Sequence, residues 1–357
     1  MNEANQLNEE ERRAISLHEK SIVILMHDHL PITCDIPKMR AGGVTAKVYN
    51  LICDVEISGD FRASANQYEG WAKRALVQID QAITEIESNE NVLLALTAED
   101  IEKAKREEKI AILFGSEGGK LLEGELSLLR NFYRLGLREL QLTWAFENQL
   151  ANSNGLTDFG KDVVKEMNRL GIIIDLTHIP QRVFDDVLSL TKHPVIISHC
   201  AAKAVSADLS DEQIRAIAQN GGVLGLHFYS TYMAKRFPPL AKGGQGEFAN
   251  DAVAKQPPAP FVKGEIGVSD LVDHIDYIAN LVGIDHVGLG ADFFPTYGEW
   301  AEFQEAQGTY NIKWVIKDKS AMPDVTRELV FRGYSDSEIQ KIVGLNFLRI
   351  CHIVFGS

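Results

Sequence analysis

Residues 172–178 read IIIDLTH and residues 194–199 read PVIISH. Each is a short run of mostly branched apolar residues that ends in a histidine and lacks the alternation of a half-exposed strand. Continuous apolar runs of this length are typical of parallel strands that are covered on both faces. The sequence therefore predicts two buried strands whose carboxyl ends carry an imidazole.

Other apolar runs end in the same kind of side chain. They are followed by His27 and His29 after SIVILM (21–26), by Glu117 after KIAILFGS (109–116), and by Asp292 after HVGLGA (286–291). In a parallel α/β barrel the carboxyl ends of all strands meet at one face, where catalytic residues lie. Imidazoles and carboxylates gathered there can bind one or two divalent transition ions. The pattern predicts a metal-dependent hydrolase.

Apolar runs and amphipathic segments alternate along the chain, which predicts a (β/α)8 TIM-type barrel of the α/β class. The expected strands are 21–26, 44–54, 109–115, 138–144, 171–177, 194–199, 221–227 and 286–292. The expected helices between them are 67–87, 120–135, 157–170, 180–191, 211–219 and 268–283. An open doubly wound sheet is the alternative, but no glycine-rich nucleotide loop follows an early strand.

The whole chain, residues 1–357, is expected to form a single barrel domain. Three segments extend the barrel pattern: a leader helix at 1–20, a Pro- and Gly-rich insertion at 228–267, and C-terminal helices within 323–353. Because long loops in compact domains are commonly functional, we expect the insertion to form a lid over the catalytic face.

Composition narrows the range of partners. The net charge of −14 argues against nucleic-acid binding, which requires clustered Lys and Arg. No segment reads as a signal peptide or a membrane span, and the four cysteines are scattered. We therefore expect a cytoplasmic enzyme with reduced thiols that acts on a small molecule without a membrane partner; the sequence is also compatible with a homodimer.

The candidate site residues have distinct expected roles. His27 and His29 are two residues apart on one strand and therefore lie on the same face of it. Both side chains should point into the barrel, while Asp28 points outward. Glu117 can place one carboxylate oxygen on each of two metals and bridge them. Asp292 is the expected general base, which takes a proton from the attacking water and gives it to the leaving group.

At these residues the chain resembles the renal (membrane) dipeptidase family of the amidohydrolase superfamily, from about residue 20 to the C-terminus. The motifs that carry the resemblance are HDHLP, the GGV at 42–44, GSEGG, LTW with Asn148, NGLTDFGKDVVKEMNRLGIIIDLTH, PVIISHC, NGGVLGLHFY, HIDYIANLVGIDHVGLGADF and GLNFLR. The resemblance implies a (β/α)8 barrel with two metal ions, most commonly Zn²⁺ with Mn²⁺ or Co²⁺ as alternatives, that splits dipeptides and tolerates a D residue on the C-terminal side.

The same resemblance implies how the ligands are divided. His27, His29 and Glu117 would hold one ion, and Glu117, His178 and His199 the other. Asp292 would act on the attacking water.

The sequence departs from the family pattern at three places. The first motif is usually His-x-Asp, whereas its second ligand here is His29; the exchange leaves the metal pair one unit more positive. Trp144 replaces a catalytic histidine and cannot become cationic. The segment AAKAVSADLSDEQ lacks the arginine that binds the substrate carboxylate, and Lys203 is its only cation.

The leading interpretation is thus a dipeptidase-like metallohydrolase of amide bonds with an altered carboxylate pocket. We assign substrate binding to Trp144, Asn148, His227 and Phe293, and regard Phe146 and Phe294 as further parts of an aromatic wall. Without the arginine, a substrate that lacks a free C-terminal carboxylate is expected to be handled better than an ordinary dipeptide. The alternatives are a non-peptide amidase or lactonase, and a catalytically silent metal-binding protein.

Overall fold

Eight parallel strands form the centre of the fold. The computed structural model describes residues 8–55, 67–144, 146–202, 208–230, 233, 266–306 and 313–356. In hydrogen-bonded order the eight strands are β1 (Ile24–Asp28), β2 (Ala46–Cys53), β4 (Ile110–Glu117), β5 (Glu139–Gln141), β8 (Ile173–Asp175), β9 (Ile196–Ala202), β11 (Val223–Leu226) and β12 (Val287–Leu289). Two further strands pair at the side of this path, β3 (Val92–Leu94) with β4 and β10 (Asp208–Leu209) with β9. A separate hairpin joins β6 (Ala151–Asn152) to β7 (Gly155–Leu156).

Backbone hydrogen bonds close the ring between its first and last strands. The His29 N–H donates to the carbonyl of Phe293 at 2.8 Å, and the Asp292 N–H donates to the carbonyl of His27 at 3.0 Å. The strand order and this closure confirm the predicted (β/α)8 barrel and exclude the open doubly wound sheet.

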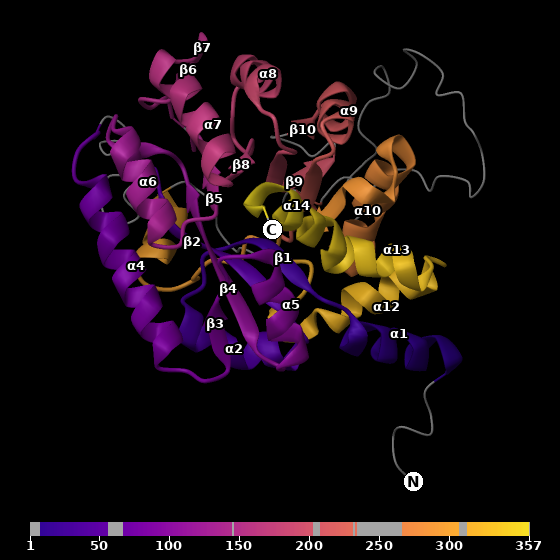
Figure 1. Ribbon diagram of the computed structural model, residues 1–357. Helices are drawn as coiled ribbons and strands as arrows, with labels where there is room; N and C mark the ends of the chain where they lie inside the picture. Colours follow the sequence, from indigo (N-terminus) through magenta and orange to yellow (C-terminus); the bar gives the residue numbers. More distant parts are fainter. Residues whose placement is uncertain are drawn as a thin grey trace.

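Helices surround the strands. Figure 1 shows α4, α6, α7, α8, α9 and α10 following one another around the outside of the barrel. In chain order, the helices through α10 are α1 (Glu9–Lys20), α2 (Ile32–Ala41), α4 (Trp71–Glu87), α5 (Ala98–Arg106), α6 (Leu126–Arg134), α7 (Asp158–Leu170), α8 (Gln181–Leu190), α9 (Asp211–Gln219) and α10 (Val268–Val282). Those that follow are α11 (Glu299–Ala306), α12 (Pro323–Phe331), α13 (Asp336–Gln340) and α14 (Asn346–Phe355).

Several elements differ from the sequence-based expectation. The helix expected over 120–135 begins only at Leu126, because Glu123 and Gly124 adopt left-handed backbone angles that a helix cannot continue. The sequence patterns did not indicate α2, β3 and α5, which are short and lie between β1 and β4 in the chain. Most of the expected lid, residues 231–232 and 234–265, lies outside the described residues, as do residues 1–7 of the leader segment.

Apolar side chains fill the half of the barrel at the amino-terminal ends of the strands. Met26, Val48, Leu113 and Ile196 are buried in one cluster with Phe347 of α14, so this helix covers the amino-terminal end of the strands. The opposite, carboxyl end is left for polar side chains. Among the described residues, none of the helices has the length and apolar character needed to cross a bilayer.

Candidate metal centre

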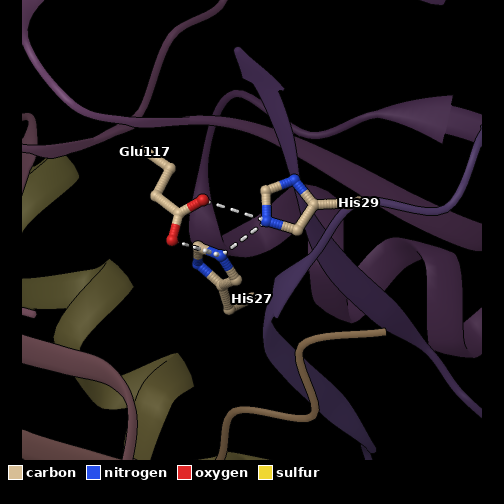
Figure 2. A group of neighbouring side chains, drawn as sticks. All are labelled: His27, His29 and Glu117. Atoms are coloured by element: carbon tan, nitrogen blue, oxygen red, sulfur yellow. Dashed lines mark hydrogen bonds and ion pairs between the residues drawn. The ribbon is translucent and has the colours of Figure 1, made fainter. Parts of the chain in front are cut away.

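His27, His29 and Glu117 form the first group of donors, and their donor atoms all lie within 4.8 Å of one another. Figure 2 shows both imidazoles pointing at the carboxylate of Glu117. The His29 Nε2 atom is 3.1 Å from His27 Nε2 and 3.2 Å from Glu117 Oε2. Asp28, between the two histidines, points the other way and accepts a hydrogen bond from Lys47 at 2.8 Å. The alternation expected from the sequence is therefore present.

The second group consists of Glu117, His178 and His199. Glu117 Oε1 lies 3.3 Å from His178 Nε2 and 3.6 Å from His199 Nε2, and the two imidazole nitrogens are 2.9 Å apart. The carboxylate of Glu117 thus directs Oε1 toward the second group and Oε2 toward His29. The His178 side chain is 35% exposed and that of Glu117 only 6%, so the centre opens to solvent on the His178 side.

Both donor groups have dimensions that suit a transition ion. Donor atoms around a tetrahedral zinc ion with bonds of about 2.0–2.1 Å lie roughly 3.3 Å apart. In the first group His29 Nε2 lies 3.1 Å from His27 Nε2 and 3.2 Å from Glu117 Oε2, and the three separations in the second group are 2.9, 3.3 and 3.6 Å. The two imidazole nitrogens of each group can share a proton in the metal-free protein, and a bound cation would take the place of that proton. The donor set therefore fits two divalent ions.

Burial and neighbouring groups set the protonation of these donors. Burial lowers the pKa of His27, and lowers that of His199 well below its ordinary value, which favours the neutral imidazole that binds metals. Burial alone would raise the pKa of Glu117, but hydrogen bonds from His178 and His29 outweigh it and lower that pKa well below its ordinary value. Glu117 is therefore a carboxylate in the structure.

Two site residues have a strained backbone. His178 has φ of 62° and Asp292 has φ of 52°, in the left-handed region that non-glycine residues rarely adopt. Each lies three residues beyond the last residue of its strand, β8 or β12. Such conformations persist where the surrounding structure imposes them, and they are concentrated at functional sites.

Asp292 lies at the centre together with His227. Asp292 Oδ1 is 3.6 Å from His29 Nε2 and 3.7 Å from His27 Nε2, whereas Oδ2 is 3.1 Å from His227 Nε2. Burial alone would raise the pKa of Asp292, but the hydrogen bond from His227 and the charges of the nearby histidines lower it below its ordinary value. Asp292 is thus ionised, with one oxygen held by His227 and the other directed at the centre.

The residues predicted to bind substrate lie in different environments. The ring centroid of Trp144 is 6.3 Å from that of His178 and 6.3 Å from that of Phe146, so Trp144 borders the centre. Asn148 uses its amide for four internal hydrogen bonds, which favours a structural role for it. Phe293 is 3% exposed, and its ring packs on those of Phe228 and Trp314. Lys203 lies outside the described residues.

A cavity of about 850 Å³ lies beside the first donor group. His29 and Cys53 are among the residues that line this cavity, together with Trp300, Lys73 and Arg74. The Trp300 ring lies 5.0 Å from that of His29, centroid to centroid. The aromatic stretch FFPTYGEW (293–300) supplies part of the cavity wall through Pro295, Tyr297 and Trp300, whereas Phe293, which was predicted to bind substrate, does not line the cavity.

Residues 11–355 match the family model described as membrane dipeptidase (Peptidase family M19). A crystal structure of an amidohydrolase from Pseudomonas aeruginosa is 25% identical, with a TM-score of 0.78, over 96% of this chain and 99% of that one. The probable dipeptidase PvdM from Pseudomonas aeruginosa is 23% identical, with a TM-score of 0.72, over 97% and 98% of the two chains.

A third solved structure adds a ligand. It is a metallo peptidase from Rhodobacter sphaeroides, liganded with a phosphinate mimic of the dipeptide L-Ala-D-Ala. That protein is 19% identical, with a TM-score of 0.73, over 94% of this chain and 99% of its own. At this level of identity the likeness is one of fold.

Proposed function

Because the chain belongs to the membrane dipeptidase family, and is thus a dipeptidase-like metal-dependent hydrolase, we propose that it cleaves the amide bond of a small molecule at two zinc ions. The observation that carries the proposal is the shared position of Glu117, with one oxygen toward each histidine group. We assign one ion to His27, His29 and Glu117, and the other to Glu117, His178 and His199.

The ions, when bound, would polarise the amide carbonyl and make water a better nucleophile. The chain supplies the proton transfer. Asp292 is ionised and its Oδ1 faces the centre, so we assign it to accept a proton from the attacking water and to return it to the leaving amine. His227 keeps Asp292 oriented by holding Oδ2.

The cavity beside His29 is the proposed place for part of the substrate, since its volume of about 850 Å³ is in the range of small-molecule sites. Trp144 and Trp300 offer apolar surface on either side of the centre. This environment suits an apolar or aromatic substituent next to the amide bond.

Specificity is proposed to differ from that of an ordinary dipeptidase. Trp144 stands where the family pattern has a histidine, and residues 200–213 contain no arginine. A small amide without a free C-terminal carboxylate is therefore the favoured substrate class, and a cyclic amide or lactone is the second candidate on the same grounds.

We also propose that the enzyme works in a reducing compartment such as the cytoplasm, because Cys34, Cys53, Cys200 and Cys351 are all unpaired thiols. The experiment that tests the function is a hydrolysis screen of zinc- and manganese-loaded protein. It should cover dipeptides, N-acyl amino acids and small cyclic amides, with the Asp292→Asn variant as the blank. Turnover in the parent protein alone supports the proposal, and metal binding without turnover of any of these classes contradicts it.

A further inference from the structure

A layer of polar side chains lies inside the barrel, between the donor groups and the apolar half at the amino-terminal ends of the strands. It is formed by Asn50 of β2, Glu139 and Gln141 of β5, and Asp175 of β8, all buried. Within the part of the chain that the structure describes, Asn50 Oδ1, both carboxyl oxygens of Glu139 and Asp175 Oδ2 have no hydrogen-bond partner. Because an unpaired buried oxygen costs free energy, this arrangement requires an explanation.

The contact between Asn50 and His27 gives the first part of that explanation. His27 directs Nε2 at the donor group, and its Nδ1 lies 2.9 Å from the side-chain nitrogen of Asn50. A nitrogen that binds a cation must have a free lone pair, so the ring proton of His27 belongs on Nδ1. If the side-chain nitrogen of Asn50 faces His27, its N–H group and the Nδ1–H group of His27 would point at each other. The oxygen and nitrogen of an asparagine amide are assigned from the hydrogen-bond network, and here the network favours the reversed amide.

Glu139 gives the second part. A Cβ atom at Gly115 would collide with Glu139 Oε2 and would lie 3.0 Å from the oxygen of Asn50, so these two groups share the space that Gly115 leaves open. Reversing the amide brings the Asn50 oxygen to His27 Nδ1 and turns its N–H₂ group toward the Glu139 carboxyl group. The reversal gives partners to both Asn50 and Glu139 at once.

We propose that Glu139 is a positioning residue for the metal centre, which acts through Asn50 to fix the proton of His27 on Nδ1. In this relay Glu139 accepts from Asn50, and Asn50 accepts from His27, so that Nε2 keeps its lone pair for the cation. The inference rests on the proposed function insofar as the cation is concerned. The reversed orientation of Asn50 also follows without a cation, from the unpartnered oxygens of Asn50 and Glu139, and it places the ring proton of His27 on Nδ1.

Asp175 supports the other side of Glu139. It lies on the adjacent strand β8, and burial together with the negative charge of Asp175 raises the pKa of Glu139 well above its ordinary value. A protonated Glu139 can donate from one oxygen to Asp175 while the other oxygen accepts from Asn50. The conservative variant Glu139→Gln can make the same two bonds, because its amide donates toward Asp175 and its carbonyl accepts from Asn50.

The test compares metal affinity with stability in five variants. Removing the acceptor in Glu139→Met, or the relay in Asn50→Leu, should weaken zinc binding about 10–100-fold in a chelator competition. The double variant should be no weaker than the worse single variant, because both act in one chain of hydrogen bonds. Glu139→Gln should stay close to the parent protein. Gln141→Met is the matched control, since it removes a buried polar side chain from the same strand without touching the relay.

Thermal unfolding of the metal-free proteins separates positioning from folding. Glu139→Met leaves the buried side chains of Asn50 and Asp175 without a partner, so its melting temperature should fall, but its zinc affinity should fall by more than that loss of stability explains. If zinc affinity falls only in step with the melting temperature, or falls equally in Gln141→Met, Glu139 has only a structural role and the relay is wrong.

A spectroscopic readout is independent of any metal. In metal-free protein carrying ¹⁵N-labelled histidine, long-range ¹H–¹⁵N spectra at neutral pH should show the His27 proton on Nδ1. In Glu139→Met and Asn50→Leu this preference should be lost. A His27 proton on Nε2 in the parent overturns the relay even if the protein is an active metallohydrolase. Absence of both zinc binding and turnover in the parent, with the tautomer as expected, would instead contradict the proposed function alone.

Discussion

The Nε2 atom of His227 lies 3.1 Å from Oδ2 of Asp292. The tautomer of His227 follows from its other ring nitrogen, because the backbone N–H of Tyr229 donates to Nδ1 at 2.8 Å. Nδ1 is therefore an acceptor, and the ring proton is on Nε2, where it is donated to Asp292. His227, the residue directly after β11, thus orients the proposed general base through its imidazole.

This relationship predicts a shift in the pH dependence of activity. The hydrogen bond from His227 helps to keep the pKa of Asp292 below its ordinary value. In His227→Leu that bond is lost, so the pKa of Asp292 should rise and the acid limb of kcat/KM should move to higher pH. His227→Gln keeps an N–H donor and should move the limb less. An unchanged acid limb in His227→Leu would mean that another group controls it.

The role of Asp292 itself is tested by Asp292→Asn. The amide cannot accept and return a proton near neutral pH, so turnover should fall about 10²–10⁴-fold, the usual range for a general base. Metal content, measured by mass spectrometry, should stay at the parent level because His227 and the donor groups are unchanged. Near-parental turnover in this variant would assign the proton transfer to another residue.

Removing the shared carboxylate should affect both donor groups. Glu117 Oε2 is 3.2 Å from His29 and Oε1 is 3.3 Å from His178, so Glu117→Ala should weaken the binding of both ions. His178→Ala removes a donor from the second group only and should leave the first ion bound. Metal titration followed by calorimetry distinguishes the two variants. Loss of a single ion in Glu117→Ala would contradict the shared position.

Much of the barrel and of the donor set could be predicted from the sequence. The buried strands were visible because both faces of a parallel strand are covered, which leaves uninterrupted apolar runs. His178 and Asp292 could be identified because they follow such runs directly. Their left-handed backbone angles could not, since they arise from the packing of the ring and not from local preference.

Residues that support the donors were harder to predict. Ser198 contacts His27 Nδ1 at 3.2 Å and His199 Nδ1 at 3.0 Å, but a serine inside an apolar run has no sequence pattern of its own. Glu139 could not be selected because its partners come from neighbouring strands. Lys47 and Lys319 are 272 residues apart and meet only in the folded chain.

Those two lysines belong to a buried cluster beneath His27 and His29. Lys47 lies 2.8 Å from both Asp28 and Asp35, and Lys319 lies 2.7 Å from Asp28 and also pairs with Asp35. Lys319→Met leaves two buried carboxylates with one cation, so it should lower the free energy of unfolding by about 3–5 kcal/mol. The matched control is Lys161→Met, whose exposed pair with Asp158 should contribute at most about 1 kcal/mol. Equal stability of the two variants in denaturant would contradict the importance of the cluster.

The last prediction concerns the substrate carboxylate. A dipeptide brings a negative charge into the site, and the family pattern pairs that charge with an arginine which this chain lacks after His199. Losing one charge-assisted contact typically costs about 1.5–3 kcal/mol, or roughly tenfold to a hundredfold in binding. A C-terminal amide does not require the missing cation. The kcat/KM for a dipeptide amide should therefore exceed that for the free dipeptide at the same zinc load.

The cavity offers the strongest argument against this expectation. Lys73 and Arg74 both line its wall, and the Arg74 guanidinium lies 4.7 Å from the centroid of the Trp71 ring. If these residues bind the carboxylate, the free dipeptide will be the better substrate and Lys73→Met or Arg74→Met will abolish its advantage without affecting the amide. A strong preference for the free acid would thus reject the amide hypothesis and transfer carboxylate recognition from the loop after β9 to the start of α4.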